Sequence, residues 1–144
     1  VAGAVCDYLG QKTGTRCSEL IIENGGDTYI KSSQDITAQV FTANSKLTNN
    51  INLHIPHQIT PCGLCCSSGK FGHSFSMGKA DIACVLATTA IAADAAATAM
   101  ANCISSPEHV ERAIEKFKSQ KGILGLLALK DKTIGIWGQV QLVP

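Results

Sequence analysis

The stretch Asp81-Ile-Ala-Cys-Val-Leu-Ala87 runs into Thr88-Thr89 and then Ala90-Ile-Ala-Ala-Asp-Ala-Ala-Ala-Thr-Ala-Met-Ala-Asn-Cys103. Six of the first seven residues are apolar, which is typical of a strand covered on both faces. Either threonine can cap the alanine-rich segment, which predicts a helix ending near Cys103. A buried strand followed directly by a buried helix indicates a layered domain.

The flanking sequence predicts more strands than helices. Asn24-Gly25-Gly26-Asp27 lies between two apolar runs, which indicates a hairpin. Ser106-Pro107 begins a helix with apolar residues at i, i+3, i+4 and i+7. The remaining predictions are a helix over 1–13, strands over 20–23, 28–32, 36–42 and 51–55, and a C-terminal β-meander over 123–129, 133–137 and 139–143. Without strict βαβ alternation, these elements predict one α+β domain over residues 1–144.

Charge and composition exclude several classes of partner. Twelve Lys and Arg against eleven Asp and Glu give a formal net charge of +1, and aromatic residues make up 5%. Without a basic stripe or stacking platforms we expect no nucleic-acid partner. The apolar region Ile82–Ile104 is mostly alanine and contains Asp94, so we expect no membrane span. With no signal peptide visible, we expect a cytoplasmic protein whose seven cysteines are reduced, with Cys84 and Cys103 buried.

The first residues predict a missing neighbour. Val1, Val5, Tyr8 and Leu9 share one side of an amphipathic helix that begins within its own pattern. We expect an upstream segment, or a second chain, to complete the domain, with a homo-oligomer as the alternative.

Asp94, Thr98 and Asn102 recur every four residues and share one helix face. A carboxylate among alanines must be paired, hydrogen-bonded or bound to a cation. A carboxylate followed one turn later by a hydroxyl suits Mg²⁺ carried by a phosphate. The alternative is a solvent-facing stripe, although such stripes usually contain Lys and Glu.

Cys62-Gly-Leu-Cys65-Cys66-Ser67-Ser68-Gly69 reads as a glycine-punctuated loop with three interpretations. The cysteines can bind zinc with help from His54, His57 or His73. They can instead carry redox or sulfur chemistry, or be incidental thiols. Ser67, Ser68, Gly69 and the neighbouring Gly72-His73-Ser74 offer hydroxyls and backbone N–H groups that can cradle a phosphate, with His73 as an acid or base.

Taken in order, these motifs resemble the uncharacterised ApbE-like proteins of archaea and anaerobic bacteria. That family is distantly related to the ApbE flavin transferases, which use Mg²⁺ to move FMN from FAD onto a threonine. The resemblance implies an ApbE-like mixed sheet with packed helices, the C-terminal part of a longer protein, incomplete without an upstream segment. It implies FAD or FMN as cofactor, Mg²⁺ at Asp94 and Thr98, and cofactor binding by Asn24, Gly25, Gly26, Asp27, Ser67, Ser68 and Gly69.

The chain also departs from the transferases. Their His-x-x-Asp-Pro-x-x-Gly segment is replaced by Gly72-His73-Ser74-Phe75-Ser76, in which only His73 corresponds. Three hypotheses follow. The first is a nucleotide-handling enzyme that uses Mg²⁺ and His73. The second is a sulfur-handling protein for sulfide assimilation, in which Cys65 carries a persulfide and Cys62 or Cys66 resolves it. The third is a non-catalytic ligand-binding or structural subunit with a decayed site.

Overall fold

The structure is a computed structural model that describes residues 1–41, 51–69 and 80–144. The helices of these residues are α1 (Ala2–Thr13), α2 (Ala90–Cys103) and α3 (His109–Phe117), with a 3-10 turn over His57–Ile59. The strands are β1 (Leu20–Asn24), β2 (Asp27–Lys31), β3 (Ile36–Val40), β4 (Ile51–Ile55), β5 (Cys62–Ser67), β6 (Ile82–Ala87), β7 (Ile123–Lys130), β8 (Thr133–Gly138) and β9 (Gln141–Val143). The α+β class is confirmed.

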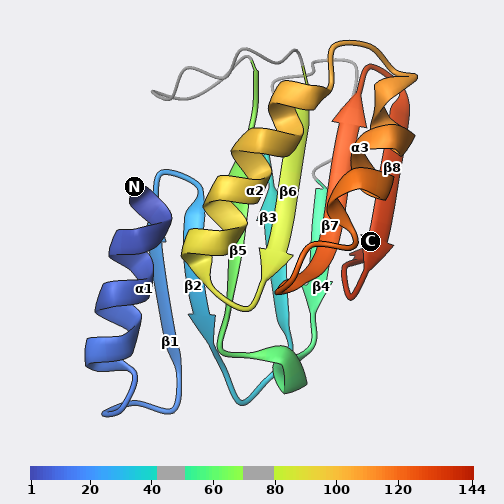
Figure 1. The fold of residues 1–144 in the computed structure, drawn as a ribbon. Coiled ribbons are helices and arrows are strands. Elements are labelled where there is room, and N and C mark those ends of the chain that lie inside the picture. Colours follow the sequence, from blue (N-terminus) through green and yellow to red (C-terminus); the bar gives the residue numbers. More distant parts are fainter. Residues whose placement is uncertain (42–50, 70–79) are drawn as a thin grey trace.

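The elements form three layers (Figure 1). The middle layer is a six-stranded sheet in the order β1-β2-β5-β6-β7-β8, and a three-stranded sheet, β3-β4-β9, lies behind it. The three helices cover the front face. All seven described strand pairings are antiparallel.

The middle sheet is apolar on both faces, because strand residues alternate between them. On β6, Ala83, Val85 and Ala87 pack under the helices, whereas Ile82, Cys84 and Leu86 pack against the second sheet. This burial on both faces confirms the prediction for the strand. Thr89 caps α2, since its hydroxyl accepts a hydrogen bond from the N–H of Ala92 at 3.2 Å.

Small residues set the distance between α2 and the sheet. A Cβ atom added to Gly63 of β5 would lie 2.3 Å from the Ala90 Cα atom. α1 approaches equally closely, because a Cβ on Gly3 would lie 2.4 Å from the Ala90 carbonyl oxygen. The helices can therefore approach this closely only where both sides lack side-chain bulk.

The large apolar side chains of α1 lie outside the core. The helix buries Gly3, Cys6, Asp7 and Gly10 against the rest of the domain. Val5, Tyr8 and Leu9 remain 43%, 62% and 42% exposed, on the side that the sequence marked as apolar.

Three local predictions were wrong. The segment after Cys62 is not a loop but the central strand β5, because Cys62, Leu64 and Cys66 alternate with Gly63 and Cys65 between the two cores. β9 does not extend the meander, since it pairs with β4 in the second sheet. Cys103 is exposed at the end of α2.

The expectation that all cysteines are reduced is also corrected. Cys66 and Cys84 are direct partners in the β5–β6 register and form a disulfide. Among the described residues, none of the helices combines the length and the hydrophobicity that crossing a membrane requires.

Candidate functional site

Two carboxylates predicted to serve different purposes meet at the end of the sheet where β2 begins. Asp27 follows the β1–β2 turn, and Asp94 lies one turn into α2. Their side chains lie within hydrogen-bonding reach of one another. The two residues are 67 positions apart in the chain, and the packing of α2 across β2 and β5 brings them together.

The turn that carries Asp27 is a tight two-residue connection. Gly25 and Gly26 have φ values of 65° and 96°, in the left-handed region that favours glycine. The Glu23 carboxylate accepts a hydrogen bond from the Gly26 N–H at 2.8 Å. Asn24 and Asp27 close the hairpin as a cross-strand pair. The predicted turn is thus confirmed, and its glycines leave the edge beside Asp27 uncrowded.

Asp94 also holds the beginning of α1. Its Oδ2 atom accepts a hydrogen bond from the Gly3 N–H at 3.1 Å. The Asp94 side chain is nevertheless 21% exposed, so one side of it faces solvent. This contact satisfies a backbone donor in the first turn of α1, a structural role that the sequence did not reveal.

Burial and charge alter the acidity of Asp27. Desolvation raises the pKa of its carboxyl above the ordinary value of 3.8, and the negative charge of Asp94 raises it further. The nearby Cys65 side chain opposes this by lowering the pKa of the carboxyl. Two carboxylates in this arrangement favour either a shared proton or a bound cation.

This raised pKa predicts a measurable pH dependence of folding. The native state binds the Asp27 proton more tightly than the unfolded chain does. The contribution of Asp27 to stability is therefore greatest below the unfolded pKa and falls as pH rises through the folded pKa. We expect Asp27→Asn, without divalent cations, to remove this fall and to be more stable than the parent at pH 7. Thermal unfolding from pH 3 to 8 in EDTA measures this effect, and parallel curves for the two proteins would contradict it.

The chemistry of the donors fits a hard cation. Thr98 is half-buried one turn after Asp94 on α2, on the same helix face. Among residues 1–41, 51–69 and 80–144, no three His, Cys, Asp or Glu side chains are grouped so that they can hold a metal ion. Two carboxylates and a hydroxyl are few donors for zinc, but they suit Mg²⁺, which keeps several waters and takes further oxygens from phosphates.

Cys65 lies directly beneath this pair. It is the register partner of Asp27, is 0% exposed, and its thiol donates to the Ala90 carbonyl at 3.3 Å. Burial, followed by the charge of Asp27, raises the pKa of Cys65. Cys6 is also fully buried and donates to the Asp27 carbonyl at 3.3 Å. These surroundings disfavour the thiolate, so they give no support to Cys65 as a nucleophile; its catalytic role stays a prediction.

Asp7 of α1 is a residue that sequence reasoning missed. Its carboxylate oxygens accept hydrogen bonds from the N–H groups of Ala90 and Ile91 at 2.9 and 2.8 Å. Asp7 is 8% exposed. The two helices thus cap each other, since Asp94 of α2 accepts from α1 and Asp7 of α1 accepts from α2. No signal in the sequence marks Asp7, because the large apolar side chains of α1 lie on the exposed side of the helix.

We expect Asp7→Asn to destabilise the domain by about 2–3 kcal/mol, because one N–H of α2 loses a charged acceptor inside the protein. Thr89→Ala is the matched comparison, since it removes an ordinary side-chain cap from the same helix at a cost of about 1 kcal/mol. Urea denaturation of both variants measures the difference. A smaller loss for Asp7→Asn than for Thr89→Ala would contradict this role.

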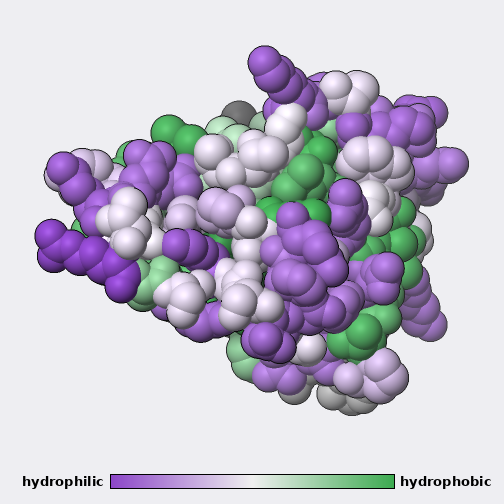
Figure 2. Space-filling view, turned by 90° about the horizontal axis from the view of Figure 1, so that it is seen from below, coloured by the Kyte–Doolittle hydropathy of each residue, from purple (hydrophilic) through white to green (hydrophobic). Residues whose placement is uncertain are grey.

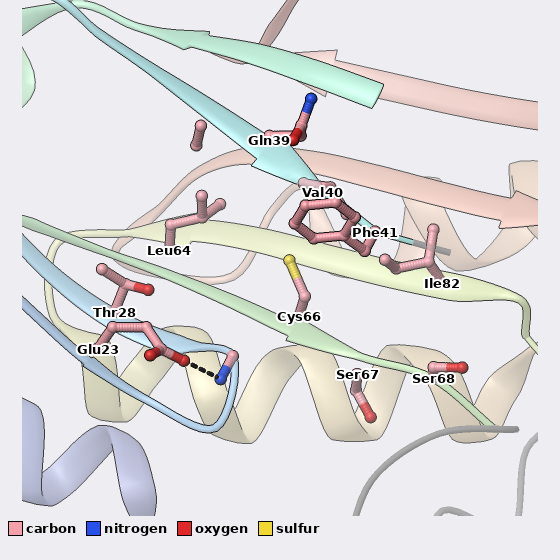
Figure 3. A pocket seen from close by; sticks show the side chains of 12 residues that line it. Glu23, Thr28, Gln39, Val40, Phe41, Leu64, Cys66, Ser67, Ser68 and Ile82 are labelled. Carbon is pink, nitrogen blue, oxygen red and sulfur yellow. Dashed lines mark hydrogen bonds between the residues drawn. The ribbon is translucent and has the colours of Figure 1, made fainter. Parts of the chain in front are cut away.

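A pocket of about 510 Å³ opens on the other face of the sheet (Figure 3). It lies between β3 and the strands β2, β5 and β6, and the predicted cofactor-binding residues Gly26, Ser67 and Ser68 line it. The Cys66 sulfur points towards Val40 and Phe41, whereas the Ser67 hydroxyl points to the opposite side of β5. Gly69 follows, and its N–H donates to the Ala80 carbonyl at 3.0 Å.

The predicted histidines are not assembled with the cysteines. His57 Nδ1 lies 2.7 Å from Asp35 Oδ1, and His54 Nε2 lies 3.5 Å from Asp35 Oδ2. Cys65 faces the helices, and Cys66 is bonded to Cys84. The set of His54, His57 and loop cysteines considered for zinc is therefore wrong. His73 and its neighbours Gly72 and Ser74 lie outside the described residues.

The end of the molecule that is lower in Figure 1, away from the β1–β2 turn, has a different surface. Figure 2 shows mainly hydrophilic residues there, with hydrophobic ones in separate areas. The carboxylate pair and the pocket are instead gathered where the β1–β2 turn adjoins the end of β5.

Comparison with known proteins places these features in a family. A family model described as AbpE bacteria matches residues 1–125. A UPF0280 protein of Methanocaldococcus jannaschii is 32% identical over 97% of this chain and 59% of its own length. UPF0280 proteins of Methanobrevibacter smithii and Archaeoglobus fulgidus are 35% and 34% identical over 97% of the chain, and 61% and 59% of their own lengths. The chain therefore spans about three fifths of these relatives.

Proposed function

The chain belongs to the AbpE bacteria family, and from this premise we propose that it binds FAD, or another nucleotide diphosphate, through Mg²⁺. The observation that carries the proposal is the meeting of Asp27 and Asp94 where β2 begins. In this proposal Asp27, Asp94 and the Thr98 hydroxyl hold the cation. When bound, Mg²⁺ would neutralise phosphate charge.

The surrounding residues suit the rest of such a ligand. Gly25 and Gly26 bring the backbone close to the cation-binding side chains without side-chain bulk. Ser67 and Ser68 lie at the end of β5, where their hydroxyls can bind phosphate oxygens. In this proposal His73 is the acid or base, and the family is a distant branch of the ApbE flavin transferases.

The test is the binding of FAD and ADP, measured by isothermal titration calorimetry at constant ionic strength, in Mg²⁺ and in EDTA. We expect binding in Mg²⁺ and its loss in EDTA. Equal affinity in Mg²⁺ and in EDTA would contradict the proposal. Release of AMP from bound FAD would indicate a transferase-like enzyme, whereas tight binding without AMP would favour the non-catalytic subunit.

The exposed face of α1 supports a proposal about partners. Val5, Tyr8 and Leu9 present apolar surface that the described chain leaves uncovered. We propose that an upstream segment or a second copy packs there. Sedimentation of this chain and of the longer Methanocaldococcus jannaschii relative separates the two possibilities, since only self-association makes the short chain dimeric.

A further inference from the structure

We propose that the pocket between the sheets is a reaction site for small neutral thiols, which exchange with the Cys66–Cys84 disulfide and become attached to Cys66. The site is distinct from the carboxylate pair, because Cys66 faces the second sheet and Asp27 faces the helices. It requires neither Mg²⁺ nor a nucleotide, so it can fail or succeed independently of the function proposed above.

The two sulfurs of the disulfide are unequally accessible. Cys66 is half-buried and lines the pocket, with its sulfur directed towards Phe41 (Figure 3). Cys84 is 1% exposed within the core between the sheets. A thiolate entering the pocket therefore reaches Cys66, and Cys84 is the leaving group.

The other cysteines of the middle sheet take no part in this reaction. Cys62 and Cys65 are both 0% exposed, and burial raises the pKa of the Cys62 thiol to about 12. As free thiols they contain no disulfide bond for an entering thiolate to attack, and their burial also keeps them from attacking the mixed disulfide as thiolates. Cys17 and Cys103 are more accessible but lie outside the pocket lining.

The pocket walls define the class of thiol. Val40, Phe41, Leu64 and Ile82 supply apolar surface, and the volume is within the range of small-molecule sites. Among the lining residues the ionisable side chain is Glu23, a carboxylate. An additional negative charge on the thiol would be repelled, so an uncharged body is favoured.

The reaction is balanced without an external oxidant. The thiolate RS⁻ forms a bond to Cys66 Sγ as the bond between Cys66 Sγ and Cys84 Sγ breaks. The electron pair of that bond stays on Cys84, which takes a proton from water. The products are a mixed disulfide on Cys66 and a free thiol on Cys84, so one disulfide replaces another.

The experiment uses the chain carrying Cys17→Ser and Cys103→Ser, so that neither accessible free thiol interferes. The probes are 2-mercaptoethanol, which is neutral, and mercaptoacetate, which is similar in size but anionic. After an acid quench and alkylation, peptide mass spectrometry locates the adduct. We expect the adduct on Cys66 and the alkylating agent on Cys84. At equal thiolate concentration, we expect 2-mercaptoethanol to form the adduct about tenfold faster than mercaptoacetate.

Two tryptophan variants test whether the pocket is the route. Ala38 lines the pocket from β3, whereas its neighbour Thr37 is exposed on the opposite face of the same strand. We expect Ala38→Trp to slow the exchange at least tenfold and Thr37→Trp to leave it unchanged. An adduct on Cys84, equal rates in these variants, or Cys66 and Cys84 both alkylated before thiol is added would each overturn the proposal.

Discussion

Gly63→Ala is expected to destabilise the domain by at least about 4 kcal/mol, which is the range of severe core substitutions. The new Cβ would lie 2.3 Å from the Ala90 Cα and 2.4 Å from the Ala90 nitrogen. Both are backbone atoms of α2, so no side-chain rotation relieves the contact. The helix must move away from β5 by about 1 Å or more, which opens the tightly packed alanine core. Urea denaturation followed by circular dichroism measures the loss.

Gly25→Asn is the matched control for Gly63→Ala. An added Cβ at Gly25 meets nothing within 4 Å, and asparagine tolerates the φ of 65° at this position. We expect its stability to lie within about 0.5 kcal/mol of the parent. A Gly63→Ala protein as stable as Gly25→Asn would show that α2 does not rest on β5 as described.

Asp94→Asn is expected to weaken Mg²⁺-dependent binding of FAD by about 100-fold, because it removes one of two carboxylates from the proposed cation site. The amide oxygen can still accept a hydrogen bond from the Gly3 N–H, so α1 stays attached. Removing the charge also relieves the repulsion of Asp27. We therefore expect an unfolding midpoint in EDTA no lower than that of the parent, together with lost binding in calorimetry.

Glu111→Gln is the control for Asp94→Asn, since it removes the same charge from an exposed position on α3. It should bind FAD in Mg²⁺ as the parent does. Unchanged Mg²⁺-dependent affinity in Asp94→Asn, with Glu111→Gln also unchanged, would remove Asp94 from the cation site. Equal losses of FAD affinity in the two variants would show that the effect comes from the overall charge of the protein and not from a cation site.

The structure supports the three functional hypotheses to different degrees. Asp27 and Asp94 were assigned separate roles, and their meeting supports cation binding at one shared site. The sulfur hypothesis placed the reactive thiol at Cys65, which is fully buried beneath that pair. Cys66 lines an accessible pocket, so the thiol exchange that we propose lies on the other side of the same strand.

The local pattern of the sequence determined the elements with the strongest signals. The apolar run ending at Ala87, the threonine cap, the Asn24–Asp27 turn and the apolar stripe of α3 each record a preference of neighbouring residues. Such preferences are readable because backbone geometry and burial act within a few residues. The α+β class follows from them.

Tertiary structure alone decided the features that depend on distant residues. Glycine, cysteine and serine made 62–67 look like a loop, yet β5 is central because Gly63 admits α2 and Cys62 and Leu64 fill the second core. The exchange of caps by Asp7 and Asp94, the meeting of Asp94 with Asp27, and the Cys66–Cys84 pair each join separate segments. Spacing along the chain carries no record of these contacts, because strand register and helix approach are set by packing of the whole domain.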